Sequence, residues 1–178
     1  MGRTMNRELF LPTPEGEMRL LLLIDAFSGQ QEGLQGRTKL AKLDFLLRYP
    51  EFLKRALRAK NVDVGDGAEA LFVEPNPIEQ RMVRYRFGPW DPSYFSLLGS
   101  LLGRGLITVV PYNRGLGYKT TPEGSALANR VSEDPSWRPL YESSKLLRRH
   151  FNLAGSSLKR FVYETFPEVG SARWNDPL

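Results

Sequence analysis

Five basic side chains in the middle of the chain have the type and spacing needed to contact phosphate groups. They are Arg84, Arg86, Arg104, Arg114 and Lys119. Residues 81–120 contain six basic residues against the single acid Asp91. Such a local excess of positive charge favours nucleic-acid binding. The sequence therefore predicts a candidate nucleic-acid-binding surface here, and a solvated basic surface is the alternative interpretation.

Residue types that carry out catalysis are scarce in this chain. It has no cysteine and only one histidine, His150, which removes thiolate chemistry and multi-histidine metal sites. It also lacks a glycine-rich phosphate loop followed by Lys-Ser or Lys-Thr. We expect a protein that is not an enzyme and that needs no cofactor or metal. A nucleic-acid enzyme using the acids between Asp63 and Glu79 as metal ligands is the third and weakest hypothesis.

Composition indicates an ordinary globular protein. The 178 residues are 41% hydrophobic and 25% charged, with a formal net charge of +5, and this length suits one domain over residues 1–178. The longest apolar run, Leu20–Ile24, is too short to cross a bilayer. With no secretory signal and no cysteine, we expect a cytoplasmic protein without a membrane partner.

Helix signals flank the candidate basic surface. Asp91-Pro92 provides an N-cap acceptor and a proline at a tolerated first position, so a helix is expected from there to Gly103. Thr121-Pro122 repeats this signal for the next helix. The helical spacing predicts one broad buried face, made of Tyr94, Phe95, Leu97, Leu98, Leu101 and Leu102.

Strand signals lie between and before these helices. Residues 82–87 alternate apolar and basic side chains, residues 106–110 are rich in β-branched residues, and residues 113–117 form a glycine turn before a strand over 117–120. The order strand, helix, strand, turn, strand, helix is typical of a winged helix. We therefore predict an α+β fold, a winged helix with a small antiparallel sheet and appended C-terminal helices.

The N-terminal half supplies two more expected helices. Residues 17–27 are apolar nearly all round, which predicts a buried helix at the centre of the fold. Residues 38–49 place Leu43 on a buried face, with Lys39, Lys42 and Phe45 projecting elsewhere. The acidic insertion 61–76 has no predicted role.

The core and the partner surface are expected in different parts of the chain. Leu43, Leu98 and Leu127 should be buried together, each from a different helix of the winged-helix core, residues 17–131. The helical extension, residues 132–178, has more aromatic residues than a minimal winged helix requires, and aromatic residues dominate interface energies. Trp137 and Tyr163 are the candidate partner-binding residues, facing either a different protein or a second copy of the chain.

Two stretches resemble a known family. Residues 37–50, RTKLAKLDFLLRYP, are similar to the TKLxKLDFLLRYP signature of the middle components of bacterial ABC-three-component systems. Residues 84–92, RYRFGPWDP, together with 105–107 and 118–124, resemble the winged half of the same proteins. The resemblance covers residues 17–131.

This resemblance implies a non-catalytic adaptor in an anti-phage or anti-plasmid defence complex. Its partners would be an SMC-like ATPase of the Rad50 type and an effector subunit, and any DNA binding would be non-specific. A dimeric winged-helix transcriptional regulator is the alternative. About forty residues, 50–90, separate the helix before Pro50 from the candidate recognition helix. A DNA-reading helix-turn-helix joins these two helices by roughly three or four residues, which argues against operator binding.

Overall fold

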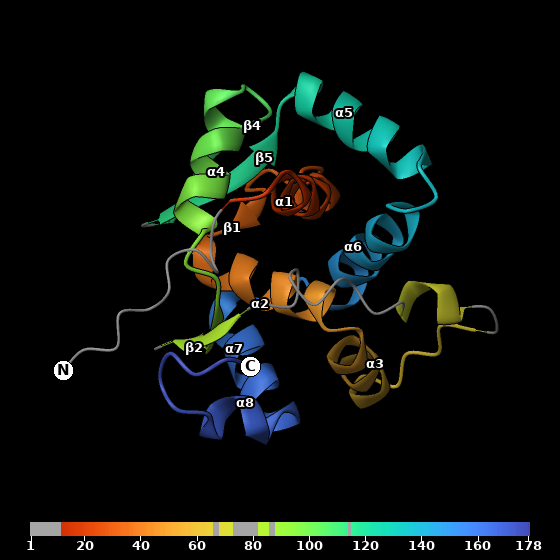
Figure 1. The fold of residues 1–178 in the computed structure, drawn as a ribbon, viewed down its shortest axis with the longest axis vertical. Helices are drawn as coiled ribbons and strands as arrows, with labels where there is room; N and C mark the ends of the chain where they lie inside the picture. Colours follow the sequence, from red (N-terminus) through yellow and green to blue (C-terminus); the bar gives the residue numbers. More distant parts are fainter. Residues whose placement is uncertain (1–11, 66–67, 73–81, 86–87, 114) are drawn as a thin grey trace.

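The computed structural model describes residues 12–65, 68–72, 82–85, 88–113 and 115–178. Within them the chain forms an α+β fold with two small antiparallel sheets (Figure 1). The elements in chain order are α1 Pro14–Phe27, β1 Leu34–Gln35, α2 Arg37–Arg48, α3 Pro50–Ala59, the 3-10 helix η2 Ala68–Phe72, β2 Val83–Tyr85, β3 Gly88–Trp90, α4 Tyr94–Gly103, β4 Ile107–Tyr112, β5 Gly115–Thr120, α5 Pro122–Glu133, α6 Arg138–His150, α7 Gly155–Thr165 and α8 Pro167–Ser171.

Helix α1 is the centre around which the other elements pack. Thr13 caps its start by accepting a hydrogen bond from the Gly16 amide at 2.9 Å, and Pro14 occupies the first turn. Its apolar run Leu20–Ile24 is completely buried. Helices α4, α5 and α6 and strand β5 all contact α1, which Figure 1 shows nearly end-on among them. The expectation of a buried central helix is confirmed.

The larger sheet has the strand order β1-β5-β4, and all its pairs are antiparallel. Strands β4 and β5 form the expected hairpin, but β5 begins at Gly115, paired with Tyr112, rather than at Gly117 as predicted. Gly117 allows β5 to approach the chain before β1, because a Cβ atom there would lie 2.2 Å from the Glu32 carbonyl oxygen. The second sheet is the hairpin β2–β3, with Gly88 at a φ of 115° that favours glycine.

The two predicted helix starts have different outcomes. Thr121 caps α5 by accepting a hydrogen bond from the Gly124 amide at 3.0 Å, as expected. The prediction for α4 was wrong by two residues, because the helix begins at Tyr94 rather than after Asp91. The Asp91 side chain instead accepts hydrogen bonds from the Ser93 amide and hydroxyl in the turn that precedes the helix.

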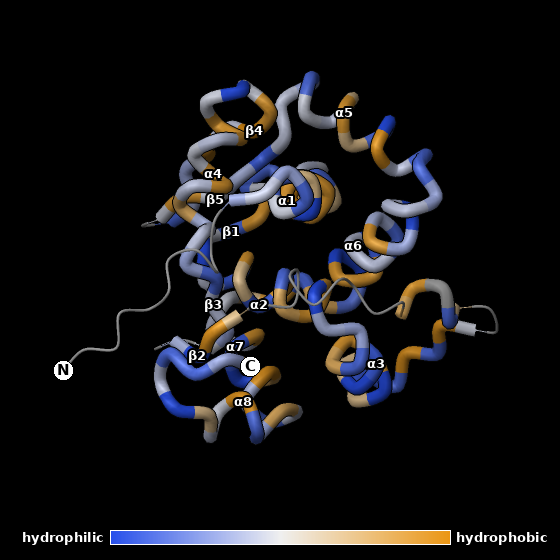
Figure 2. Tube along the Cα trace, viewed as in Figure 1, coloured by the Kyte–Doolittle hydropathy of each residue, from blue (hydrophilic) through white to orange (hydrophobic). Residues whose placement is uncertain are grey.

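Two of the three predicted core leucines are buried. Leu43 and Leu98 are inside, whereas Leu127 is only half-buried, because α5 is an outer helix that buries mainly Gly124 and Ala128. Figure 2 shows that hydrophilic and hydrophobic residues alternate along α5 and α6.

Helix α2 is buried on more sides than its sequence indicated. Lys39, Lys42 and Phe45 were expected to project away from the core, but all three are buried. The reason is that α7 packs on that side of α2. The Phe45 ring contacts the Phe166 ring at the end of α7, with 6.1 Å between ring centroids.

The residues after α8 pair with β2 instead of forming the loose tail that was expected. The Arg84 amide donates to the Asp176 carbonyl at 3.0 Å, and the Leu178 amide donates to the Met82 carbonyl at 3.0 Å. This pairing brings the Trp174 ring to 6.4 Å from the Tyr85 ring. The C-terminal segment therefore completes the surface beside the β2–β3 hairpin.

Two helix glycines should respond oppositely to alanine. A Cβ atom at Gly99 in α4 would have nothing within 4 Å, whereas one at Gly124 in α5 would lie 1.8 Å from the Leu106 carbonyl oxygen. Gly99→Ala should raise the free energy of unfolding by about 0.5–1 kcal/mol through helix propensity. Gly124→Ala should lower it by about 1–3 kcal/mol through steric strain. Urea denaturation of both variants measures this, and equal effects would contradict the packing of α5 on the residues before β4.

Candidate binding site

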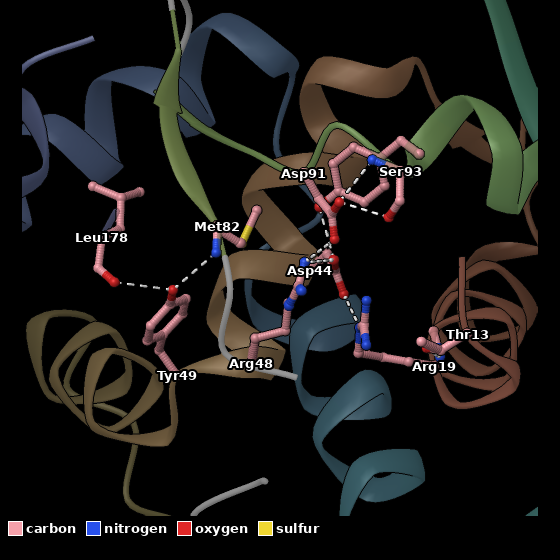
Figure 3. A network of polar contacts seen from close by, with 11 residues as sticks. Thr13, Arg19, Asp44, Arg48, Tyr49, Met82, Asp91, Ser93 and Leu178 are labelled. Atoms are coloured by element: carbon pink, nitrogen blue, oxygen red, sulfur yellow. Dashed lines mark hydrogen bonds and ion pairs between the residues drawn. The ribbon is translucent and has the colours of Figure 1, made fainter. Parts of the chain in front are cut away.

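A buried ionic cluster joins α1, α2 and the turn before α4 (Figure 3). The Asp44 carboxylate accepts hydrogen bonds from Arg19 Nε at 2.7 Å and from the Tyr94 hydroxyl at 2.7 Å. Arg48 Nη1 lies 2.6 Å from Asp91 Oδ2 and 3.4 Å from Asp44 Oδ2. All four charged residues are buried, and their two positive and two negative charges balance.

Asp44 and Arg48 are held in their charged forms by their neighbours in this cluster. Burial alone would raise the pKa of Asp44, but the Arg19 and Arg48 guanidinium groups outweigh it and lower that pKa. Burial would lower the pKa of Arg48, but the Asp44 and Asp91 carboxylates reverse that effect and raise it. Burial and the neighbouring Asp44 charge raise the pKa of Tyr94, which keeps its hydroxyl a donor. The cluster is a structural unit without a neutral base for catalysis.

Replacing Asp44 by Asn should destabilise the protein strongly. The variant leaves two buried guanidinium groups without their shared carboxylate, which costs about 3–5 kcal/mol. Because the folded pKa of Asp44 lies below its ordinary value of 3.8, its stabilising charge is present above about pH 4. That contribution is lost as the pH falls through the folded pKa. Chemical denaturation between pH 3 and pH 7 should therefore show that the free energy of unfolding falls less with decreasing pH in Asp44→Asn than in the wild type. Asp63→Asn, on the surface, is the control and should behave like the wild type.

The basic residues predicted to bind phosphate are partly engaged inside the protein. Arg84 donates from Nε to the Val169 carbonyl and from Nη2 to the Gly170 carbonyl, each at 3.2 Å. Arg104 is exposed but lies 2.6 Å from the Glu17 carboxylate. Arg84 and Arg104 thus already have acceptors for their guanidinium groups.

Of the other three predicted phosphate-binding residues, Lys119 lies in the described part of the chain. Lys119 is half-buried on β5, in the other sheet from Arg84. Arg86 and Arg114 lie outside the described residues. Phosphate binding by these five residues remains a prediction.

The two candidate partner residues are half-buried rather than exposed. Trp137 lines a cavity of about 330 Å³ together with Arg19, Arg48 and Leu140. The Tyr163 ring faces the Arg84 guanidinium at 5.9 Å. Both lie against residues of the 17–131 segment, so they are less exposed than predicted.

A larger cavity, of about 480 Å³, lies between α2, the β2–β3 hairpin and the start of α4, and we call it the aromatic pocket. Its lining residues are Arg37, Thr38, Ala41, Lys42, Val83, Tyr85, Gly88, Pro89, Trp90, Pro92, Phe95 and Asn175.

Aromatic rings dominate this pocket. The rings of Tyr85 and Trp90 lie 5.8 Å apart, those of Trp90 and Phe95 lie 6.3 Å apart, and Trp174 joins the group through Tyr85. Tyr85 is 45% exposed, and Phe95 and Trp174 are each 61% exposed. Exposed aromatic rings in contact with one another are uncommon on a surface without a ligand or partner.

The charged groups that line the aromatic pocket are both positive. The Arg37 guanidinium lies 4.5 Å from the centre of the Phe95 ring, and Lys42 Nζ donates to the Thr38 carbonyl at 3.1 Å. Burial, with a smaller effect of Lys159, lowers the pKa of Lys42 to about 8. The described residues that line the pocket include no acid to neutralise these two cations.

Helix α4 continues the apolar surface beyond the pocket. Phe95 and Leu102, two turns apart, were expected in the core but are both exposed. Gly99 and Gly103 lie on the same helix with open space at their Cβ positions. We call these four residues the α4 face.

The buried side of the helix uses Tyr94, Leu97, Leu98 and Leu101, at the spacing i, i+3, i+4, i+7. Phe95 and Leu102 form a second stripe at i, i+7, a signal in the sequence that could have identified this face.

Comparison with protein-family models, with curated proteins and with solved structures found no match for this chain. No family assignment follows from similarity. Among the described residues, no helix is long and apolar enough to cross a membrane. The same residues contain no group of three acidic or histidine side chains placed to hold a metal ion.

Lys42→Met should make the protein more stable at neutral pH, because it removes a charge from a buried position. Between about pH 8 and pH 10.5 the unfolded chain holds the Lys42 proton and the folded chain has released it. The wild-type free energy of unfolding should therefore rise with pH over this range. In denaturation experiments at a series of pH values, the free energy of unfolding of Lys42→Met should increase less over this range. The increase that remains comes from Lys39, whose pKa is also about 8. Lys145→Met, on the surface of α6, should leave the rise unchanged.

Proposed function

We propose that this chain is a non-catalytic winged-helix adaptor that binds a partner protein through the aromatic pocket and the α4 face. The elements α1, β1, α2, α4, β4 and β5, with the sheet order β1-β5-β4, support the winged-helix part of this proposal, although α3, η2, β2 and β3 lie between α2 and α4. The strand that joins β4 and β5 is β1, whereas the strand predicted over residues 82–87 belongs to the separate β2–β3 sheet. In this interpretation α4 occupies the place of the recognition helix, and the β4–β5 hairpin is the wing.

The observation that carries the proposal is the gathering of exposed apolar side chains at one site. The described residues include five large exposed hydrophobic side chains: Tyr85, Phe95, Leu102, Leu116 and Trp174. Four of them belong to the aromatic pocket, its ring cluster or the α4 face, and only Leu116 lies on the wing. Clustered aromatic residues beside a cavity are typical of the energetic centre of a protein interface.

The partner is proposed from the resemblance of residues 37–50 and 84–92 to middle components of ABC-three-component systems. On that basis the partners are an SMC-like ATPase of the Rad50 type and an effector subunit of a defence complex. Residues 37–42 of the first motif and residues 84–92 of the second both supply lining residues of the aromatic pocket. The motifs that carry the resemblance thus meet at the proposed interface.

The alternative is a winged-helix transcriptional regulator, favoured by the net charge of +5. Its weakness is the exposed side of α4, where Phe95, Gly99 and Leu102 offer no hydrogen bonds to base edges. Arg104, at the end of the same helix, is paired with Glu17. We therefore expect any DNA binding to be weak and independent of sequence.

The adaptor proposal is tested by co-purifying the chain with a coiled-coil ATPase encoded beside its gene, using two matched variants. Phe95→Ser removes an exposed ring from the pocket, and Leu116→Ser removes an exposed apolar side chain from the wing. Phe95→Ser should weaken the complex at least about tenfold, as truncation of an interface anchor does. Leu116→Ser should bind like the wild type.

Two further outcomes would contradict the adaptor. One is full affinity of the Phe95→Ser variant for the ATPase in calorimetric titration. The other is a stable homodimer by light scattering together with a strong preference for one of two unrelated duplexes in fluorescence anisotropy. The second result would favour the regulator.

A further inference from the structure

We infer that the aromatic pocket binds an acidic segment of the partner, in which a large apolar side chain is flanked by carboxylates. This inference rests on the proposed adaptor function and adds the chemistry of the partner segment.

The charge of the pocket is the first argument. Arg37 and Lys42 line it, and among the described residues it contains no acid. Arg37 is exposed, and in the described part of the chain its guanidinium has an aromatic ring, Phe95, as its neighbour and no carboxylate within ion-pair distance. By contrast, Arg55 and Arg104 on other parts of the surface each pair with a glutamate. Arg37 is therefore an exposed cation at the pocket that can accept an incoming anion, while the buried Lys42 adds positive charge behind the pocket wall.

The position of the pocket at the start of α2 adds to this charge. The first turn of α2 has no acidic residue and contains Arg37 and Lys39, and its N-cap, Gly36, offers no side-chain acceptor. The positive end of a helix dipole favours negative groups and disfavours these cations, unless an anion is bound nearby. A partner carboxylate beside Arg37 would be attracted both by the Arg37 charge and by the positive end of the α2 dipole.

The rings are the second argument, and they define the rest of the segment. A cage of Tyr85, Trp90 and Phe95 would suit an ammonium ligand, but the two cations in the same wall exclude one. A cavity of about 480 Å³ has room for one large apolar side chain and part of its flanking chain. A segment with an aromatic or leucine side chain can pack against the rings, and acidic residues next to it can pair with the cations.

The α4 face gives such a segment space to continue. Phe95 belongs both to the pocket and to the α4 face, and Gly99 and Gly103 have nothing within 4 Å of their Cβ positions. A backbone can therefore approach α4 closely between Phe95 and Leu102. A nucleic-acid strand fits this strip less well, because it requires a series of cations along its phosphates, and Arg104 at the end of the strip is already paired.

The inference predicts which peptides the intact chain selects from a random display library of about twelve-residue members. Bound peptides should be enriched in an aromatic or leucine residue flanked by Asp and Glu. The best of them, made synthetically without tryptophan, should change the fluorescence of Trp90 and Trp174 on titration. Its Kd should rise at least about tenfold when its acids are replaced by amides, and should also rise with salt.

Protein variants locate this binding. Arg37→Gln and Lys42→Met should each raise the Kd for the acidic peptide about three- to tenfold, although Lys42→Met is expected to be the more stable protein. Arg149→Gln, which removes the same charge from an exposed position on α6, should leave the Kd unchanged. Loss of affinity in a variant that folds more stably cannot be attributed to unfolding.

Several results would overturn the inference. They are no enrichment above background, a neutral or basic consensus, equal Kd values for the acid and amide peptides, or tighter binding of a single-stranded oligothymidylate than of any peptide. If the ATPase complex still depends on Phe95 in any of these cases, the adaptor function stands and only the acidic segment is wrong. If an acidic consensus depends on Arg37 but the ATPase does not depend on Phe95, the partner assignment fails instead.

Discussion

The position of α4 depends on the buried carboxylate of Asp44. It lies between two guanidinium groups, and Arg48 passes the connection on to Asp91, just before α4. Arg48 and Asp91 are 43 residues apart in the sequence, so this ion pair ties the turn before α4 directly to the last turn of α2. Buried ion pairs gain little net stability, because desolvation offsets their attraction, but a missing partner is costly. The cluster therefore selects one arrangement of α1, α2 and α4 over other compact ones.

This arrangement also creates the aromatic pocket. The Tyr94 hydroxyl is held by Asp44, and the next residue along α4, Phe95, lines the pocket together with residues of α2 and β3. Helix α2 thus has two roles, with its last turns in the ionic cluster and its first turns in the pocket wall. Lys42 shows the cost of the second role, since burial lowers its pKa to about 8 and its charge opposes folding at neutral pH. Proteins commonly keep such locally unfavourable residues at functional sites.

Local signals in the sequence predicted local structure well. The central apolar helix, the β4–β5 hairpin and the Thr121 cap follow from periodicity, turn glycines and capping within a few residues. Several of the failures share one cause, which is a partner distant in the sequence. Asp91 has the sequence of an N-cap, but Arg48, 43 residues earlier, recruits it into the ionic cluster. Lys39 was assigned to the surface, yet it is buried because Asn152, 113 residues later, accepts a hydrogen bond from its amine. The pocket was missed for the same reason, since its rings come from β2, β3, α4 and the C-terminal segment.

Contacts between residues distant in the sequence also determine which positive charges of this protein are available for binding. A count of basic residues over 81–120 treats every guanidinium as available to phosphate, and on that count the stretch favours nucleic acid. In the fold, the Arg84 guanidinium satisfies carbonyls near the end of α8 and Arg104 neutralises Glu17, so part of the excess stabilises the protein itself. Arg37, from a stretch that the count did not include, lies over an exposed ring at the rim of a pocket. Binding specificity follows from the charges that folding leaves without a counter-ion. At this site the Arg37 charge lies among aromatic rings. An acidic side chain beside an apolar anchor fits such a site better than a phosphate backbone does.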